Sequence, residues 1–484
     1  MLEDFLAEPS KGNLNALLGI YLLAVFALLT QQWTSRRAVG LPTAYTFSFS
    51  MMHAIGALVY ALPWYSPRSE YLLQSGASLA NTHAGFRMAC FGYVFFVLGV
   101  LLAPMVFSKD PAPKAFYADK RITTNLAGTL LIISFLAFFA APVLSRIPSM
   151  GSMGTAGAFM SVVAVFIYCH RAYRLRDTGR FILGLTSTVG FPFVTIIFLG
   201  FAGYGSTAAS MVWMFVLRFF RPRWLSLLVL GVILYGGLSF YVNWMRERES
   251  IRSSVWGARS MEHRLDRLYD LAVDFEPLDL HKQLHLELID SRLNQNDLCG
   301  KAYRYLAQGK AEFAKGYTLW VAAVAWVPRI IWPGKPVTGG SGGVVTHFTG
   351  QRFSEGTSVG AGNVLEFYVN FGWWGLMVSF FALGLALSWF DRRGAFHYER
   401  GDYWTATRWI LPGLGLIQPG GLSAEMTGSC AAYAVFAFIL HKVFFQKFYD
   451  VGDQMAAGRG SYPAPVARPQ HPVKPLPGPR YPGC

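Results

Sequence analysis

Long apolar stretches separated by short polar ones dominate the pattern along the chain. A stretch of about 18–22 apolar residues is long enough to cross a bilayer as a helix. Such stretches lie near 13–30, 40–62, 85–107, 124–144, 153–169, 181–201, 206–219, 224–244, 362–390, 404–419 and 428–445. The pattern predicts an all-α, polytopic membrane protein with about eleven transmembrane helices. The 206–219 stretch is short, and with 181–201 it could form a broken or re-entrant pair around Gly200, Gly203 and Gly205.

Composition and charge support a membrane protein. Only 14% of the residues are charged, whereas about a quarter are charged in a soluble protein of ordinary composition. The net charge of +15 does not indicate a nucleic-acid partner, because the cations gather in alternate short connections between apolar stretches. The cation-rich connections hold Arg36 and Arg37; Lys109, Lys114, Lys120 and Arg121; Arg171, Arg174, Arg176 and Arg180; Arg218, Arg221 and Arg223; Arg392, Arg393 and Arg400; and Lys442 with Lys447.

The charge alternation orients the chain. The other short connections hold little more than Arg68 and Arg146, and cation-rich short loops stay in the cytoplasm. We therefore expect a bacterial inner-membrane protein with a periplasmic N-terminus and a cytoplasmic C-terminus. Four regions follow: an N-terminal transmembrane bundle at 1–244, a large periplasmic loop or cap at 245–361, C-terminal transmembrane helices at 362–450, and a Pro- and Gly-rich tail at 451–484. The tail holds eight prolines and is predicted to be a disordered cytoplasmic extension.

The large loop has helical patterning of its own. Its first predicted helix carries Trp256, Leu265, Leu268, Leu271 and Ala272, a second follows Pro277 and carries Leu278 to Ile289, and a third covers about 302–315. Residues 317–332 are apolar but too short for a span and contain Pro328 and Arg329, which indicates an interfacial or re-entrant helix. Residues 334–362 are rich in Gly, Ser and Thr, and glycine lets the backbone approach a ligand closely. The glycines at 339–343 lack the Gly-Lys-Ser/Thr ending of a phosphate-binding loop.

Two short motifs in and after this loop resemble a known family. The sequence PRIIWPGKP at 328–336 and the sequence EFYVNFG at 366–372 resemble segments of bacterial polysaccharide polymerases of the Wzy type. The order of many helices, a large outer loop with the first motif, and a helix that opens with the second also resembles that family. At the sequence level the resemblance is confined to about 320–380.

The resemblance implies a GT-C-like helical fold and a glycosyltransferase. Such proteins join oligosaccharide repeat units carried on undecaprenyl diphosphate at the periplasmic face, and transfer the growing glycan to the incoming lipid-linked unit. The implied partners are the lipid-linked oligosaccharide, membrane lipids, a chain-length regulator and export machinery. The reaction implies no cofactor, and no residue spacing typical of a metal site is present.

This chemistry selects the candidate site residues. Arginine and lysine bind phosphate, so we assign the diphosphate first to Arg329, Lys335 and Arg352, and then to Arg87 and His83, which are spaced for one helical face. The acceptor hydroxyl needs a base, for which the candidates in order are Glu366, His347 and Glu355. Tyr368, Asn370 and Trp332 are candidates for contacting the glycan, and His53 could reach the same cavity as His83.

Structural roles and other functions stay open at this point. Arg329 could reach lipid headgroups, Glu366 could form a structural pair, and His53 could be a satisfied core residue. An O-antigen ligase is the nearest alternative enzyme. A polysaccharide transporter or flippase is an alternative of another class, although Glu366 is the one carboxylate expected in or at the edge of a span. A non-catalytic scaffold for an export complex is a third.

Overall fold

The computed structural model describes residues 8–35, 38–107, 120–146, 150–220, 223–257, 259–329, 331–336, 340–353 and 359–445, with the backbone alone at 120–125 and 444–445. The predicted tail at 451–484 and the candidate Glu355 lie outside these residues. The contacts divide the chain into Met1–Phe438 and Ile439–Cys484. The description below concerns the first of these units, together with α20, which runs across the division.

Throughout the described residues the regular structure is helical. The helices that form the predicted membrane part are α2 (Lys11–Thr34), α3 (Leu41–Met52), α4 (Ala54–Ala61), α6 (Leu79–Val106), α7 (Lys120–Leu144), α8 (Gly151–Arg174), α9 (Thr178–Ser187), α10 (Gly190–Leu199), α11 (Gly203–Val216), α12 (Arg223–Trp256), α18 (Gly362–Glu399), α19 (Tyr403–Gly415) and α20 (Ser423–Leu440). The remaining helices are α5 (Glu70–Ser75), α13 (Met261–Val273), α14 (Gln283–Leu293), α15 (Asn296–Ala307), α16 (Tyr317–Val324) and α17 (Gly340–Thr349).

Eight helical segments of the described chain are long and apolar enough to cross a membrane: α2, α6, α7, α8, α9 with α10, α12, α18 and α20. They confirm the prediction of a helical membrane protein. The other three predicted spans coincide with shorter helices. The 40–62 stretch is divided at His53 into α3 and α4, while α11 has 14 residues and α19 has 13.

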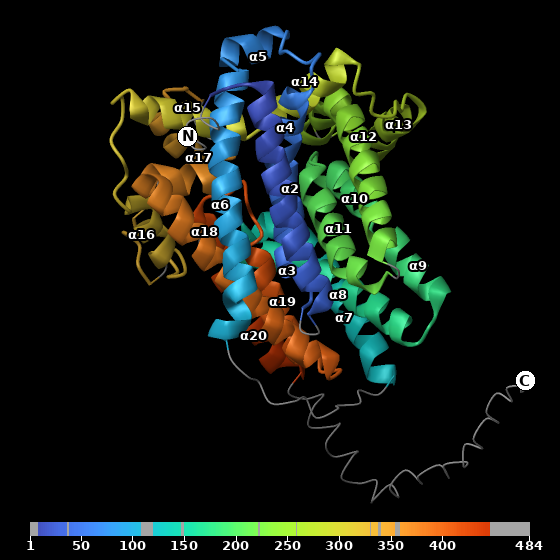
Figure 1. Cartoon of the computed structure of the whole chain (residues 1–484). Helices are drawn as coiled ribbons and strands as arrows, with labels where there is room; N and C mark the ends of the chain where they lie inside the picture. Colours follow the sequence, from blue (N-terminus) through green and yellow to red (C-terminus); the bar gives the residue numbers. More distant parts are fainter. Residues whose placement is uncertain are drawn as a thin grey trace, which may run out of the picture. The chain divides into compact units, whose positions relative to one another are not determined.

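Close helix packing in the membrane part depends on small residues. A Cβ added at Gly99 of α6 would lie 2.3 Å from the carbonyl oxygen of Phe381, and one added at Gly384 of α18 would lie 2.2 Å from that of Phe96. Small residues at such crossings let helix backbones approach closely. As a result α6 and α18 lie side by side along much of their length (Figure 1).

A buried carboxylate joins α18 to α3. Oδ1 of Asp391 accepts hydrogen bonds from the backbone N–H groups of Val39, Gly40 and Leu41 at 3.0, 2.7 and 2.9 Å. These amides stand at the start of α3, where helical N–H groups have no partner within the helix. Asp391 is therefore a structural cap. It lies one residue after the predicted span at 362–390, and α18 continues past it to Glu399.

The helices of the large loop differ in their bounds from the prediction. Helix α12 continues to Trp256, so this residue belongs to α12 and not to the following helix. The second predicted helix begins at Gln283 and not after Pro277. The third begins at Asn296 and ends at Ala307, earlier than expected. In Figure 1, α5, α13 and α14 lie at the same end of the first unit, where Glu287 of α14 accepts hydrogen bonds from the backbone N–H groups of Arg68 and Ser69.

The Gly-rich segment at 334–362 contains the helix α17. Val344, Val345 and Phe348 of α17 are buried, and α17 packs against α15. Apolar residues at this spacing form one helical face. The sequence signal for this helix is weak, because each glycine lowers helix propensity by about 1 kcal/mol relative to alanine. Burial of the apolar face against α15 offsets that preference.

Candidate functional site

Helix α18, which carries the second motif, meets α16 and α20 in a buried polar junction. Oε2 of Glu366 in α18 accepts hydrogen bonds from the N–H and the Oγ of Ser423 in α20, at 2.5 and 2.8 Å. Nδ2 of Asn370, one turn after Glu366, donates to Oγ1 of Thr318 in α16 at 2.7 Å. Oγ1 of Thr427 in α20 donates to the carbonyl oxygen of Ala322 in α16 at 2.7 Å. This junction places the end of α16 beside α20.

A cavity of about 1130 Å³ opens next to this junction. Its walls come from α3, α8, α11, the end of α16 with the segment after it, the end of α19, and α20. Most of its lining is apolar, and the charged residues among those that line it are Arg329, Lys335 and Glu425. An apolar cavity with a few convergent charges is typical of a binding site for an amphipathic ligand.

The two cations of the cavity, Arg329 and Lys335, belong to the first motif and lie in the segment after α16. Nζ of Lys335 donates to the carbonyl oxygens of Ala325 and Val327 at 2.9 and 2.8 Å. These bonds use two of its three N–H donors and hold the segment in a compact turn. Burial and the nearby charge of Arg329 lower the pKa of Lys335. A cation that is disfavoured in this way gains stability when an anion binds beside it.

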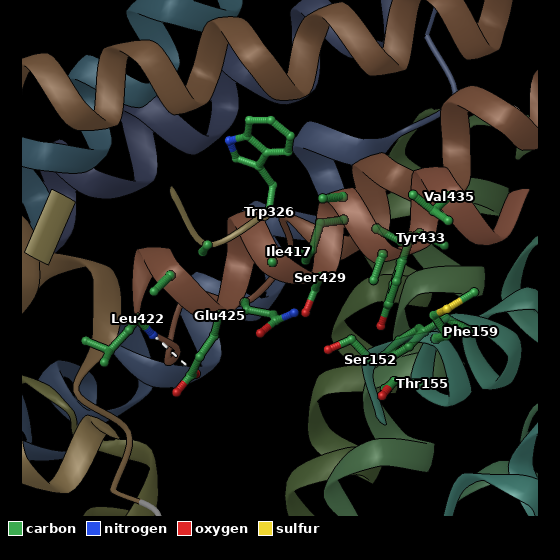
Figure 2. A pocket seen from close by; sticks show the side chains of 18 of the residues that line it. Ser152, Thr155, Phe159, Trp326, Ile417, Leu422, Glu425, Ser429, Tyr433 and Val435 are labelled. Carbon is green, nitrogen blue, oxygen red and sulfur yellow. Dashed lines mark hydrogen bonds between the residues drawn. The ribbon is translucent and has the colours of Figure 1, made fainter. Parts of the chain in front are cut away.

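Glu425 is the acidic residue of the cavity, and it was missing from the sequence-based candidates. It lies in the first turn of α20, where its Oε2 accepts a hydrogen bond from the N–H of Leu422 at 3.3 Å. Figure 2 shows its carboxylate pointing away from α20 into the open space, with Ser152 and Thr155 to the right, across the gap. The apolar pattern predicts a helix only from 428, which left Glu425 in a connection. A carboxylate in the first helical turn after Pro419, Gly420 and Gly421 was the available signal.

Glu366, the leading sequence-based candidate for the base, lies outside the cavity lining. It has no exposed surface. Its hydrogen bonds to Ser423 satisfy the first amide of α20, which is the role of a helix cap. Asn370 is buried with it. A catalytic role for Glu366 therefore stays a prediction that the geometry does not favour, because a substrate in the cavity does not reach it.

The weaker second set of cations forms a separate cluster. Nη2 of Arg87 donates to the hydroxyl of Tyr303 at 3.3 Å, and its guanidinium lies 5.2 Å from the ring centre of Trp373. The ring of Tyr368 packs 5.8 Å from that of Trp373. His83 is buried one turn before Arg87. The cavity lining includes none of these residues, so they do not join Arg329.

The remaining candidates lie outside the cavity lining. Trp332 is 39% exposed. His347 on α17 and Arg352 after it are exposed, and His347 packs against the ring of Phe348. His53, at the break between α3 and α4, is fully buried, and its Nδ1 lies 2.8 Å from Oδ1 of Asn296. Within the described residues no group of three or more His, Cys, Asp or Glu side chains could hold a metal ion.

Comparisons with known proteins give a family without an assigned activity. No curated protein matches the chain, and no solved structure matches it. One family model, described as a domain of unknown function, matches residues 43–449. This match includes every residue that lines the cavity. The chain therefore belongs to the family described as Domain of unknown function (DUF8712).

Proposed function

We propose that this protein is a membrane glycosyltransferase that polymerises oligosaccharide repeat units carried on undecaprenyl diphosphate. The observation that carries the proposal is the apolar cavity near the junction of α16, α18 and α20, lined by Arg329, Lys335 and Glu425. A polyprenyl diphosphate combines a long apolar chain with a doubly ionised headgroup. The apolar lining of the cavity suits the chain, and Arg329 and Lys335 suit the headgroup.

The three charged residues suit the steps of glycan transfer. The bond between the sugar C1 and the diphosphate oxygen breaks, and Arg329 and Lys335 stabilise the negative charge that develops on the departing diphosphate. An acceptor hydroxyl forms the new bond to C1. Its proton passes to the carboxylate of Glu425, which acts as the general base. The transferred glycan then remains on the lipid diphosphate of the acceptor.

The proposal includes a topology. We place α3 with α4, α11 and α19 in the membrane beside the eight long segments, which gives eleven crossings in a GT-C-like arrangement. The alternation of cation-rich connections supports this number. The N-terminal ends of α8, α11 and α20, which line the cavity, then lie at the periplasmic side of a bacterial inner membrane. Lipid-linked repeat units would enter there.

Incubation of the purified full-length protein with a lipid-diphosphate-linked repeat unit tests the function. We expect a ladder of products on a gel in detergent, without an ion gradient. Removing a preorganised charge stabiliser costs about 100- to 1000-fold in rate, so Arg329→Gln should slow the ladder by about 100-fold or more, and Glu425→Gln should have a similar effect. Glu312→Gln is the matched control, because Glu312 is exposed and pairs with Lys315.

The other outcomes separate the alternatives. Full activity in both Arg329→Gln and Glu425→Gln would overturn the assignment of this cavity. Transfer of a single glycan to a lipid A core, with no ladder from repeat units, would identify a ligase. Movement of the lipid-linked unit across liposomes without any new glycosidic bond would identify a transporter.

A further inference from the structure

A second cavity, of about 530 Å³, lies between α7, α8, α10 and α11. Its lining is largely aromatic and aliphatic, and includes Phe135, Phe138, Phe159, Phe191 and Phe201. It shares Thr155, Phe159, Phe201 and Tyr204 with the first cavity. The two cavities therefore lie side by side with a common wall, part of which is visible at Thr155 and Phe159 in Figure 2.

The second cavity has an arginine at one end. Between α10 and α11 the chain turns at Gly200, whose φ of +73° favours glycine. The guanidinium of Arg252, from α12, lies 4.3 Å from the ring centre of Phe201. Its Nε–H donates to the carbonyl oxygen of Gly200 at 3.3 Å, and Nε1 of Trp256 donates to that of Leu199 at 3.3 Å. These contacts fix a cation beside a wall of the apolar cavity.

Arg252 belongs to a cluster of cations. Arg248 lies one turn before it on the same face of α12, where two like charges repel each other. The charge of Arg292, in the last turn of α14, acts on both guanidinium groups, while Glu249 acts on Arg248. The ion pairs found among the described residues include none of these three arginines. Arg248 and Arg252 are only partly exposed, so an anion between them would relieve a repulsion that water only partly screens.

The length of α12 favours a position of the cluster near the lipid phosphates. Arg248 is 25 residues after Arg223, the first residue of α12, which corresponds to about 37 Å of helix. The hydrocarbon core of a bilayer is about 30 Å thick. With Arg223 at one boundary of the hydrocarbon core, Arg248 and Arg252 would lie beyond the other boundary, where lipid phosphates are found.

We propose that the second cavity binds the chain of a second prenyl-phosphate lipid, whose phosphate groups contact Arg248, Arg252 and Arg292. A single aromatic-walled cavity suits one branched, unsaturated chain better than the two acyl chains of a phospholipid. The inference rests on the proposed function, because polymerisation consumes two lipid-diphosphate substrates at once. The shared wall would place the two prenyl chains side by side, with Arg329 and Lys335 at the phosphate groups of one lipid and Arg252 at those of the other.

Photo-crosslinking tests this site by binding alone. The probe is geranylgeranyl diphosphate with a diazirine near the end of its chain, added to the purified full-length protein in nanodiscs. We expect crosslinks in peptides from α7 and α10, which line only the second cavity, as well as in α20. Hydrogen bonds to charged groups are worth about a factor of ten or more in affinity. Arg248→Gln with Arg252→Gln should therefore reduce the α7 and α10 crosslinks about tenfold, while the α20 crosslinks remain.

Two further variants keep the test independent of folding. Arg259→Gln removes an exposed arginine from the same region and should leave all crosslinks unchanged. Ala158→Leu narrows the second cavity, which Ala158 lines, and should reduce the α7 and α10 crosslinks without touching the arginines. Equal crosslinking of α7 and α10 in wild type and in the double arginine variant would overturn the proposal.

Two further outcomes distinguish a phospholipid from a prenyl lipid, and the failure of the proposed function from the failure of the lipid site. Loss of the α7 and α10 crosslinks on addition of excess phosphatidylglycerol would mean that phospholipid occupies the site, and would overturn the prenyl assignment. Arginine-dependent crosslinks in a protein that makes no glycan ladder would sink the proposed function and leave the lipid site standing.

Discussion

At the residue scale, Asp290 is a titratable group at the contact between the large loop and the membrane helices. Its Oδ2 accepts a hydrogen bond from the Tyr65 hydroxyl at 2.5 Å, and its Oδ1 accepts one from Nδ2 of Asn294 at 2.8 Å. Asp290 is only 5% exposed, and burial raises the pKa of its carboxyl to about 6. The folded protein thus holds a proton on Asp290 in a pH range where the unfolded chain releases it.

The sign of the pH effect follows from this difference. Between about pH 4 and 6 the folded state binds more protons at Asp290 than the unfolded state, so the free energy of unfolding falls as the pH rises. One pKa unit corresponds to about 1.4 kcal/mol, which limits the effect to about 3 kcal/mol. Asp290→Asn cannot titrate, and its stability relative to wild type should increase from pH 4 to pH 7. Thermal unfolding in detergent at both pH values measures the difference, and an unchanged difference would contradict the prediction.

At the element scale, the second motif contains a helix break. Phe371 and Gly372 interrupt α18 with φ of −142° and +60°. The break leaves the carbonyl oxygen of Val369 to accept a hydrogen bond from the N–H of Ala314 at 2.8 Å. The segment before α16 is thereby attached to α18. Glu366 and Asn370 lie one turn apart on α18, before the break. Both therefore face the junction with α16 and α20.

Replacing Gly372 by alanine should strain this break. Its backbone angles, φ +60° with ψ −138°, are essentially restricted to glycine, and a non-glycine residue held in such a region costs about 1–3 kcal/mol. We expect a lower unfolding temperature for Gly372→Ala. Gly236→Ala is the control, because Gly236 lies inside α12 with open space around its Cβ position, and it should be neutral or slightly stabilising. Equal unfolding temperatures for the two variants would contradict the assignment of strain.

At the scale of the whole molecule, the proposed mechanism depends on the side of the membrane that the large loop occupies. Lys310 is exposed in the segment between α15 and α16, and Gly179 is exposed at the start of α9, beside the cation-rich connection after α8. The charge pattern predicts that Lys310 lies on the periplasmic side and Gly179 on the cytoplasmic side.

Cysteine labelling in intact cells tests this orientation. In a background without the five native cysteines, Lys310→Cys should react with a membrane-impermeant maleimide, and Gly179→Cys should react only after permeabilisation. The opposite result would reverse the topology, and the proposed periplasmic reaction would then have to be abandoned.

The sequence by itself determined the properties that depend on local composition. The apolar stretches predicted the long helices, and the motif at 328–336 singled out Arg329 and Lys335, both of which line the cavity. The prediction of long helices is confirmed, because hydropathy acts over neighbouring residues. The role of Arg329 and Lys335 stays a prediction. The bounds of α14 and the extension of α12 to Trp256 were predicted wrongly, and α17 was not predicted, since packing against distant segments decides them.

Only the tertiary structure decided which carboxylate faces the cavity. Glu366 and Glu425 both stand near the start of a helix that is long and apolar enough to cross a membrane, and their neighbours along the chain do not show which of them is buried. Glu366 is buried because it contacts Ser423, 57 positions later, whereas Glu425 points into the space that α8, α11 and the end of α19 leave open. Burial of a carboxylate depends on helices that are remote in sequence. Neighbouring residues therefore show where along the chain a charge lies, but not whether a ligand can reach it.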